Sequence, residues 1–309
     1  MRLIKNESFW LLCSRFPSNH FKMKTRNIVI APCGNKAYLF KESWLKYKEE
    51  KDFDLCLLFY HEHINNPQLY SDADFFYHLK DFKWFMIDDL FTNIHPEWLQ
   101  QYEYFYFLDD DIDIDTRQIN DMFALSRAFK SSISQASLTQ DSFCSWKMFK
   151  TQKNSFCRFV GQIEVMAPLF SRDALQKCLP SFVGNRSSWG IDSVWSKLLN
   201  YPKDKLMVFD IVVMKHTAPV GGGELYQKIG VNPHDDWNAV VTKFGAKKHN
   251  YQEYGRLQLV NEHSNRLRFF FYKMREFFAK RKQDWDDYDV KSRILNKKEK
   301  LLKKKLVED

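Results

Sequence analysis

Five aspartates lie in a short stretch that directly follows an apolar run. Asp109, Asp110 and Asp111 come straight after YFYFL, residues 104–108, and Asp113 and Asp115 follow at alternate positions. Crowded carboxylates repel one another unless a cation or solvent compensates them, and Mg²⁺ or Mn²⁺ typically bridges one or two carboxylates to a diphosphate. A solvated acidic turn that caps the next helix is an equally open interpretation. An EF-hand is disfavoured, because the central glycine and the final glutamate are missing.

Two later segments carry further side chains that could do chemistry. In Ser188-Trp189-Gly190-Ile191-Asp192 a carboxylate stands at the expected start of a helix, where Asp192 could take a proton from an acceptor hydroxyl. Trp189 could offer a flat face to a sugar ring, although helix capping by Asp192 and a core position for Trp189 are the commoner roles. His216 follows the last apolar run and could complete a metal shell that carboxylates begin.

Other chemical motifs are absent or incomplete. The run Gly221–Gly223 is not a P-loop, because no Lys-Ser/Thr follows it, and the chain contains no GxGxxG, HExxH or GxSxG pattern. The six cysteines show no CxxC pair, so we expect buried thiols of a reducing compartment instead of disulfides or a zinc site.

The elements that must position these residues follow from the apolar pattern. Short apolar runs alternate with helical patterns, which favours an α/β sheet. We expect strands at residues 27–31, 53–60, 104–108, 133–138, 160–170 and 206–214. We expect helices at residues 39–50, 81–90, 96–102, from Asp115 or Thr116 to about 129, 171–179, and within 187–199.

The positive charge is confined to the end of the chain. The net charge is +8, but residues 264–309 hold 15 Lys/Arg against 8 Asp/Glu, so the body is nearly neutral. Nucleic-acid binding is therefore not expected, since it needs clustered cations on the body. Residues 264–282 form a basic amphipathic pattern that could lie on an anionic membrane, or could instead pack on the body or another subunit. No apolar stretch is long enough to span a membrane.

Three segments, taken in order, resemble the plant-rich family called domain of unknown function 707, regarded as GT-A-glycosyltransferase-like. They are Tyr104–Asn120, with its aromatic strand and acidic triplet, Gly161–Arg172 (GQIEVMAPLFSR) and Trp189–Asp192 (WGID). The resemblance spans roughly residues 27–225, and MAPLFSR and WGID are its specific parts. Ser188 stands where the family usually has a glycine.

The resemblance implies a GT-A fold, Rossmann-like, with a mixed central sheet flanked by helices. It makes Asp109, Asp111 and His216 the expected ligands of Mn²⁺ or Mg²⁺, and Asp192 the catalytic base of an inverting enzyme. Trp189 and Gly190 are expected to bind the acceptor. The donor, expected to be a UDP-sugar, would be held by further residues, namely Asp109, Asp110, Pro32, Lys36, Asp81 and Lys83.

Together these observations predict a metal-dependent glycosyltransferase with an extension at 1–26, a catalytic domain at 27–262 and a basic helical tail at 263–309. The expected acceptor is a glycan or a lipid-linked glycan, as in bacterial capsule or lipopolysaccharide synthesis. We expect the protein in the cytoplasm, with peripheral contact to the cytosolic membrane face through 264–309 as an open option. A metal-dependent phosphotransferase or nuclease, and a non-catalytic glycan-binding assembly factor, are the alternatives.

Overall fold

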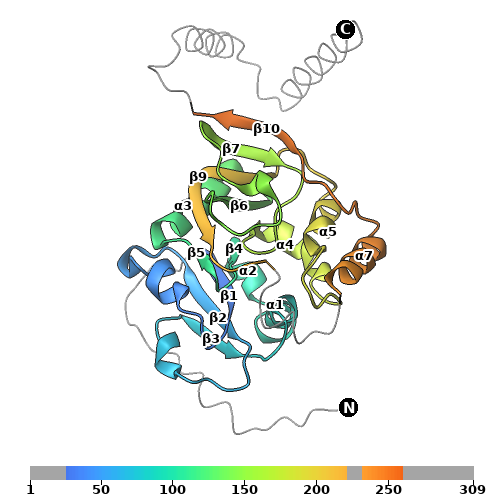
Figure 1. The fold of residues 1–309 in the computed structure, drawn as a ribbon. Helices are drawn as coiled ribbons and strands as arrows, with labels where there is room; N and C mark the ends of the chain where they lie inside the picture. The colour runs from blue at the N-terminus through green and yellow to red at the C-terminus, as the bar shows by residue number, and fades with distance from the viewer. Residues whose placement is uncertain (1–25, 221–231, 260–309) are drawn as a thin grey trace, which may run out of the picture. The chain divides into compact units, whose positions relative to one another are not determined.

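The computed structural model describes residues 26–220 and 232–259 (Figure 1). Nearly all of them belong to the first of two compact units, Met1–Gln258. The predicted basic tail, the glycine run Gly221–Gly223 and, apart from Arg26, the predicted N-terminal extension lie outside the described residues. Within the described ranges, no helix has the length and apolar character needed to cross a membrane.

One half of the central sheet is parallel. Its strands run in the order β3 (Phe75–His78), β2 (Asp54–Phe59), β1 (Asn27–Cys33) and β4 (Tyr104–Phe107), and each neighbouring pair is parallel. Every residue of β1 and β4 is buried, which agrees with their continuous apolar sequences. The carboxyl ends of these strands therefore meet at one edge of the sheet, where β4 runs into the acidic triplet.

The other half of the sheet is mixed. From β4 outward the order is β8 (Leu169–Ser171), β6 (Ile133–Leu138), β9 (Leu206–His216), β7 (Ser155–Val160) and β10 (Glu253–Gln258). Only β6 and β9 are parallel among these pairs. The short strand β5 (Ile112–Asp113) leaves this order and pairs with the end of β9, so that Ile112 lies opposite His216.

Helices flank the sheet and complete a mixed α/β fold, as predicted (Figure 1). Their bounds are Lys83–Asp89 for α1, Trp98–Gln101 for α2, Thr116–Phe129 for α3, Arg172–Cys178 for α4, Ile191–Leu198 for α5 and Pro233–Phe244 for α7. The α3 helix begins with a capping box, in which the Asp115 side chain accepts from the Gln118 N–H and the Gln118 side chain accepts from the Asp115 N–H.

The predicted helix at residues 39–50 is wrong. Residues 39–50 contain a π-helical turn at Phe40–Trp44 and a 3₁₀ turn at Lys48–Glu50 instead of one helix. The helix is interrupted because the Thr116 hydroxyl of α3 donates to the Trp44 carbonyl (2.6 Å) and accepts from the Tyr47 N–H (3.0 Å).

The predicted strand at 160–170 is also wrong over most of its length. Only Val160, at the end of β7, and residues 169–170 of β8 are extended strand, and Gly161–Pro168 is irregular. Side chains from other elements bind this segment, since Gln162 donates to the Ser193 hydroxyl (3.1 Å) and the Glu164 N–H donates to Gln135 Oε1 (2.9 Å). A Cβ on Gly161 would lie 2.3 Å from the Asn250 carbonyl oxygen, so this close approach requires glycine.

Aromatic packing fixes the two helices that carry site residues. Trp84 of α1 lies 5.2 Å from Trp195 of α5 between ring centroids, and Phe182 lies 4.5 Å from Trp84. Trp84 and Trp195 are almost fully buried. Because Lys83 precedes Trp84 and Asp192 lies one turn before Trp195, this cluster holds both polar side chains in place relative to the sheet.

Candidate functional site: an acidic cavity at the end of β4

The acidic triplet leaves the sheet in a tight turn. The Leu108 N–H donates to the Ile30 carbonyl (3.2 Å) and the Asp109 N–H donates to the Met166 carbonyl (2.9 Å), so both sides of β4 stay bonded up to the first aspartate. The Ile112 N–H then donates back to the Asp109 carbonyl (3.1 Å). The three carboxylates thus project from the carboxyl end of a central strand, which is the position predicted for them.

Asp111 and His216 are brought together by the pairing of β5 with β9. Asp111 Oδ2 lies 3.2 Å from His216 Nε2, and the Nδ1–H of His216 donates to the Phe143 carbonyl (2.8 Å). Burial alone would lower the pKa of His216, but the hydrogen bond and charge of Asp111 outweigh it and raise the pKa to about 9. The other oxygen of Asp111, Oδ1, is buried and has no hydrogen-bond partner among residues 26–220 and 232–259.

The first two aspartates have different partners. Asp109 Oδ1 accepts from Lys83 Nζ at 2.6 Å, and Lys83 also donates to the Val165 carbonyl at 2.8 Å. Asp110 Oδ2 accepts from the Tyr60 hydroxyl at 3.2 Å. Desolvation, followed by the charges of Asp111 and Asp109, raises the pKa of Asp110 to about 7. Desolvation also raises the pKa of Asp109, although Lys83 opposes the rise.

The residues around Asp111 fit a divalent cation of the expected kind. Asp111 Oδ1, which has no hydrogen-bond partner in the described part of the chain, can serve as an oxygen ligand. His216 can offer Nε2 to a metal once the imidazole has lost its Nε2 proton, since its Nδ1–H is held by the Phe143 carbonyl. Within the described residues, no group of three or more His, Cys, Asp and Glu is arranged to hold a metal ion. A pair is sufficient for Mg²⁺ or Mn²⁺, because diphosphate oxygens and water commonly complete their shells. The role of Asp109 as a ligand stays a prediction.

Asp192 occupies the first turn of α5. Its Oδ1 accepts from the Ser193 N–H at 2.9 Å and its Oδ2 accepts from the Tyr251 hydroxyl at 3.1 Å. Burial raises the pKa of Asp192 to about 6, with hydrogen bonds from Gln162, Ser193 and Tyr251 opposing the rise. A carboxylate with such a pKa is ionised at neutral pH and still basic enough to accept a proton.

Gly190 sets the position of this helix start. As the N-cap of α5 it has φ 85°, a left-handed conformation that favours glycine. A Cβ at this position would lie 2.1 Å from Cδ1 of Trp237, so the indole of α7 packs directly on the backbone. A larger residue at position 190 would be strained by the positive φ and would clash with Trp237. Glycine at this position therefore allows α5 to begin where Asp192 faces the cavity.

One cavity of about 1050 Å³ joins all the residues predicted for the site. Its lining includes the metal and base candidates Asp109, Asp111, His216 and Asp192, and the acceptor candidates Trp189 and Gly190. The expected donor residues also line it, namely Pro32, Lys36, Asp81, Lys83 and Asp110. Lys36 and Asp81 are exposed at the rim and Pro32 is buried at the end of β1. The structure thus brings the predicted residues together, while their individual roles stay predictions.

The cavity also contains residues that the sequence interpretation missed. Glu164 is 5% exposed, and one of its oxygens has no hydrogen-bond partner among the residues that the structure describes. Burial and the charge of Asp192 raise the pKa of Glu164 to about 8. A glutamate inside the apolar run 160–170 was the signal that could have singled it out. Trp237 follows the cap residue Asn232 and Pro233, a helix-start signal, but its contact with Gly190 is decided by tertiary packing.

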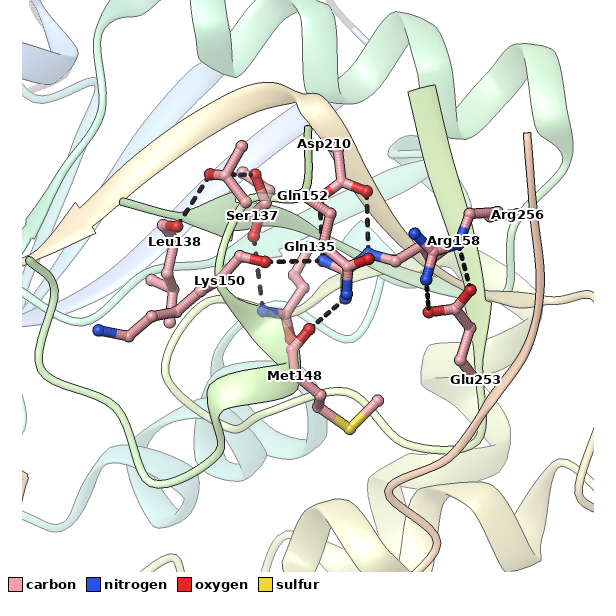
Figure 2. A network of polar contacts seen from close by, with 12 residues as sticks. Gln135, Ser137, Leu138, Met148, Lys150, Gln152, Arg158, Asp210, Glu253 and Arg256 are labelled. Atoms are coloured by element: carbon pink, nitrogen blue, oxygen red, sulfur yellow. Dashed lines mark hydrogen bonds and ion pairs between the residues drawn. The ribbon is translucent and has the colours of Figure 1, made fainter. Parts of the chain in front are cut away.

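The sequence interpretation also missed Trp146. A buried ion pair holds the segment that follows Trp146 against the sheet (Figure 2). Arg158 and Asp210 have fully buried side chains and are joined by two hydrogen bonds of 2.8 and 2.9 Å. Arg158 also donates to the carbonyls of Met148 and Lys150, and the Gln152 N–H donates to Asp210 Oδ1. The pair therefore satisfies the backbone of the segment that directly follows Trp146.

No protein-family model and no curated protein matches the chain. Among solved structures, it is similar to residues 1–349 of S. aureus TarS in complex with UDP-GlcNAc, at 13% identity and a TM-score of 0.45. That match covers 71% of this chain and 65% of the TarS chain, so this chain spans somewhat less than two thirds of that length. The UDP complex of the same protein gives 11% identity, a TM-score of 0.41 and coverages of 71% and 70%. A197 from STIV matches at 13% identity and a TM-score of 0.32, covering 60% of this chain and 82% of that one.

Proposed function

We propose that the chain is a glycosyltransferase that moves a sugar from a nucleoside diphosphate sugar, with a UDP-sugar as the expected donor, to an acceptor hydroxyl with inversion. The observation that carries the proposal is the single cavity that contains both a metal-suited pair, Asp111 and His216, and a separate buried carboxylate, Asp192. A transferase needs these two functions in one space, one to hold a leaving diphosphate and one to accept a proton.

Charge is distributed along the cavity as this reaction requires. Lys36, Lys80 and Lys83 line the part near β1 and the start of α1, and they can attract a diphosphate. Lys83 is bonded to Asp109, so its ammonium stays beside the acidic triplet. Mn²⁺ or Mg²⁺ held by Asp111 and His216 would supply the remaining positive charge for the leaving nucleoside diphosphate.

Each bond and proton in the proposed transfer is accounted for. The acceptor oxygen forms a bond to the anomeric carbon of the donor sugar while the bond from that carbon to the diphosphate oxygen breaks. The nucleoside diphosphate leaves with the electron pair of the broken bond, and the acceptor's hydroxyl proton passes to Asp192. Tyr251 and the Ser193 N–H hold the Asp192 carboxylate in place for this step.

Binding of UDP and Mn²⁺ to the full chain tests the proposal. Calorimetric titration should show UDP binding that is strengthened by Mn²⁺. Asp111→Asn should remove the Mn²⁺ effect, whereas Asp113→Asn, an exposed aspartate of the same run that does not line the cavity, should keep it. Asp192→Asn should bind UDP normally and lose about 10²–10⁴-fold in transfer rate. Failure of UDP and other nucleoside diphosphates to bind, with or without Mn²⁺, would refute the proposal.

A further inference from the structure

The cavity wall around Asp192 is a continuous band of aromatic rings. Trp146 stacks on Tyr251 with centroids 4.0 Å apart and 24° between the ring planes. Tyr251 lies 6.1 Å from His249, which lies 5.0 Å from Trp237, which in turn lies 6.1 Å from Trp189. All five rings line the cavity, and only Trp237 among them is buried. The band therefore presents ring surface to whatever enters this end of the cavity.

A buried carboxyl group shares the cavity with the band. Glu164 lines the cavity, is 5% exposed, and has one oxygen, Oε2, for which the described ranges supply no hydrogen-bond partner. A buried polar atom without a partner destabilises the fold, so a ligand that bonds to it recovers a lost interaction. The terminal torsion of glutamate is broad, and a small rotation can therefore turn either oxygen toward a ligand hydroxyl.

Ring surface beside a carboxyl group matches the two kinds of surface that a sugar ring presents. A pyranose has C–H faces, which pack on aromatic rings, and hydroxyl groups at its edge, which need polar partners. Lys36, Lys80 and Lys83, which follow β1 or lie near the start of α1, suit the anionic donor. The aromatic band shares the cavity with Asp192 and Glu164, and the ammonium of Lys248 lies 5.0 Å from the centroid of the Trp237 ring. Because Tyr251 of the band donates to the proposed base Asp192, a hydroxyl that reaches Asp192 brings its sugar ring against the band.

We propose that the aromatic band binds a sugar ring of the acceptor, with Glu164 holding one hydroxyl while a neighbouring hydroxyl faces Asp192. The inference rests on the proposed function and narrows it, since it makes the acceptor a saccharide at the point of transfer. Trp146 and Trp189 supply ring surface from two separate segments, and Glu164 selects among sugars by the hydroxyl that it binds. A site built to bond a substrate hydroxyl discriminates strongly against an analogue that lacks it.

Saturation-transfer NMR on the full chain tests this inference without any transfer reaction. The probes are the methyl glycosides of glucose, galactose, mannose, rhamnose and N-acetylglucosamine, each up to about 50 mM because single sugar rings bind in the millimolar range. At least one glycoside should bind. Trp146→Ala, Trp189→Ala and Glu164→Ala should each weaken binding about tenfold, whereas UDP affinity should stay unchanged. Phe143→Ala is the matched control, because that ring is 46% exposed and does not line the cavity.

The outcomes separate this inference from the proposed function. If UDP binds but no glycoside does, the saccharide site is refuted and the transferase proposal stands. Glycoside binding that survives both Trp189→Ala and Glu164→Ala, with each variant folded by circular dichroism, also refutes the site. If a glycoside binds in the expected way while no nucleoside diphosphate binds, the saccharide site is supported and the transferase proposal fails.

Discussion

Glu164 allows the energetic effect of burying a carboxyl group in this cavity to be measured directly. Burial, followed by the charge of Asp192, raises the pKa of Glu164 from an ordinary 4.5 to about 8, and the charge of His216 only partly opposes the rise. Glu164→Gln keeps the size of the side chain and an oxygen acceptor but removes the titrating proton. The difference in the free energy of unfolding between the two proteins, followed as a function of pH, therefore reports the cost of burying the Glu164 charge.

The sign and size of the effect follow from the two pKa values. Below pH 4.5 Glu164 is protonated in the folded and the unfolded chain, so the stabilising effect of the raised pKa is fully present. As the pH rises toward about 8, only the unfolded chain releases the proton, and the free energy of unfolding falls by about 1.36 kcal/mol per pH unit. The free energy of unfolding of Glu164→Gln should therefore rise relative to that of the wild type by about 2 kcal/mol between pH 4.5 and about pH 6. This difference corresponds to roughly 4–8 °C in melting temperature.

Differential scanning calorimetry from about pH 5 to about pH 8 measures this difference. Glu62→Gln is the control, because the Glu62 side chain is 69% exposed and its replacement should change stability by less than about 0.5 kcal/mol. A Glu164→Gln difference that stays constant over this range, or that grows as the pH falls, would show that Glu164 is not held protonated by burial.

Two further predictions concern the ion pair and the base. Arg158→Met should lower the free energy of unfolding by about 3–5 kcal/mol in calorimetry, because it leaves Asp210 buried and unpaired. Arg256→Met breaks only the partly exposed pair with Glu253 and should cost less than about 1 kcal/mol, and equal losses would contradict this assignment. The kcat/KM for transfer should fall about tenfold per pH unit below about pH 6, because Asp192 must be deprotonated to act as the base. A profile that stays level down to about pH 4 would show that another group takes the proton.

The sequence by itself determined the elements whose causes are local. Continuous apolar runs produced the buried strands β1, β2 and β4, and the acidic triplet directly follows β4, at the carboxyl end of a central strand, as predicted. The start of α3 was readable because the Asp115 cap and its Gln118 partner are three residues apart. In each case neighbouring residues decide the conformation.

Tertiary structure decided which distant residues meet. Asp111 and His216 are 105 positions apart and are joined by the pairing of β5 with β9, and no local pattern encodes that register. Glu164 lies in an apolar run whose pattern predicts a strand. The segment is irregular instead, because it forms hydrogen bonds with the side chains of Gln135 and Ser193. The contact of Trp237 with Gly190 likewise depends on how α7 packs on α5. In these places hydrogen bonds and packing between distant segments outweigh the local preference for a strand or a helix. They do so because they supply partners to buried polar groups that would otherwise remain unpaired.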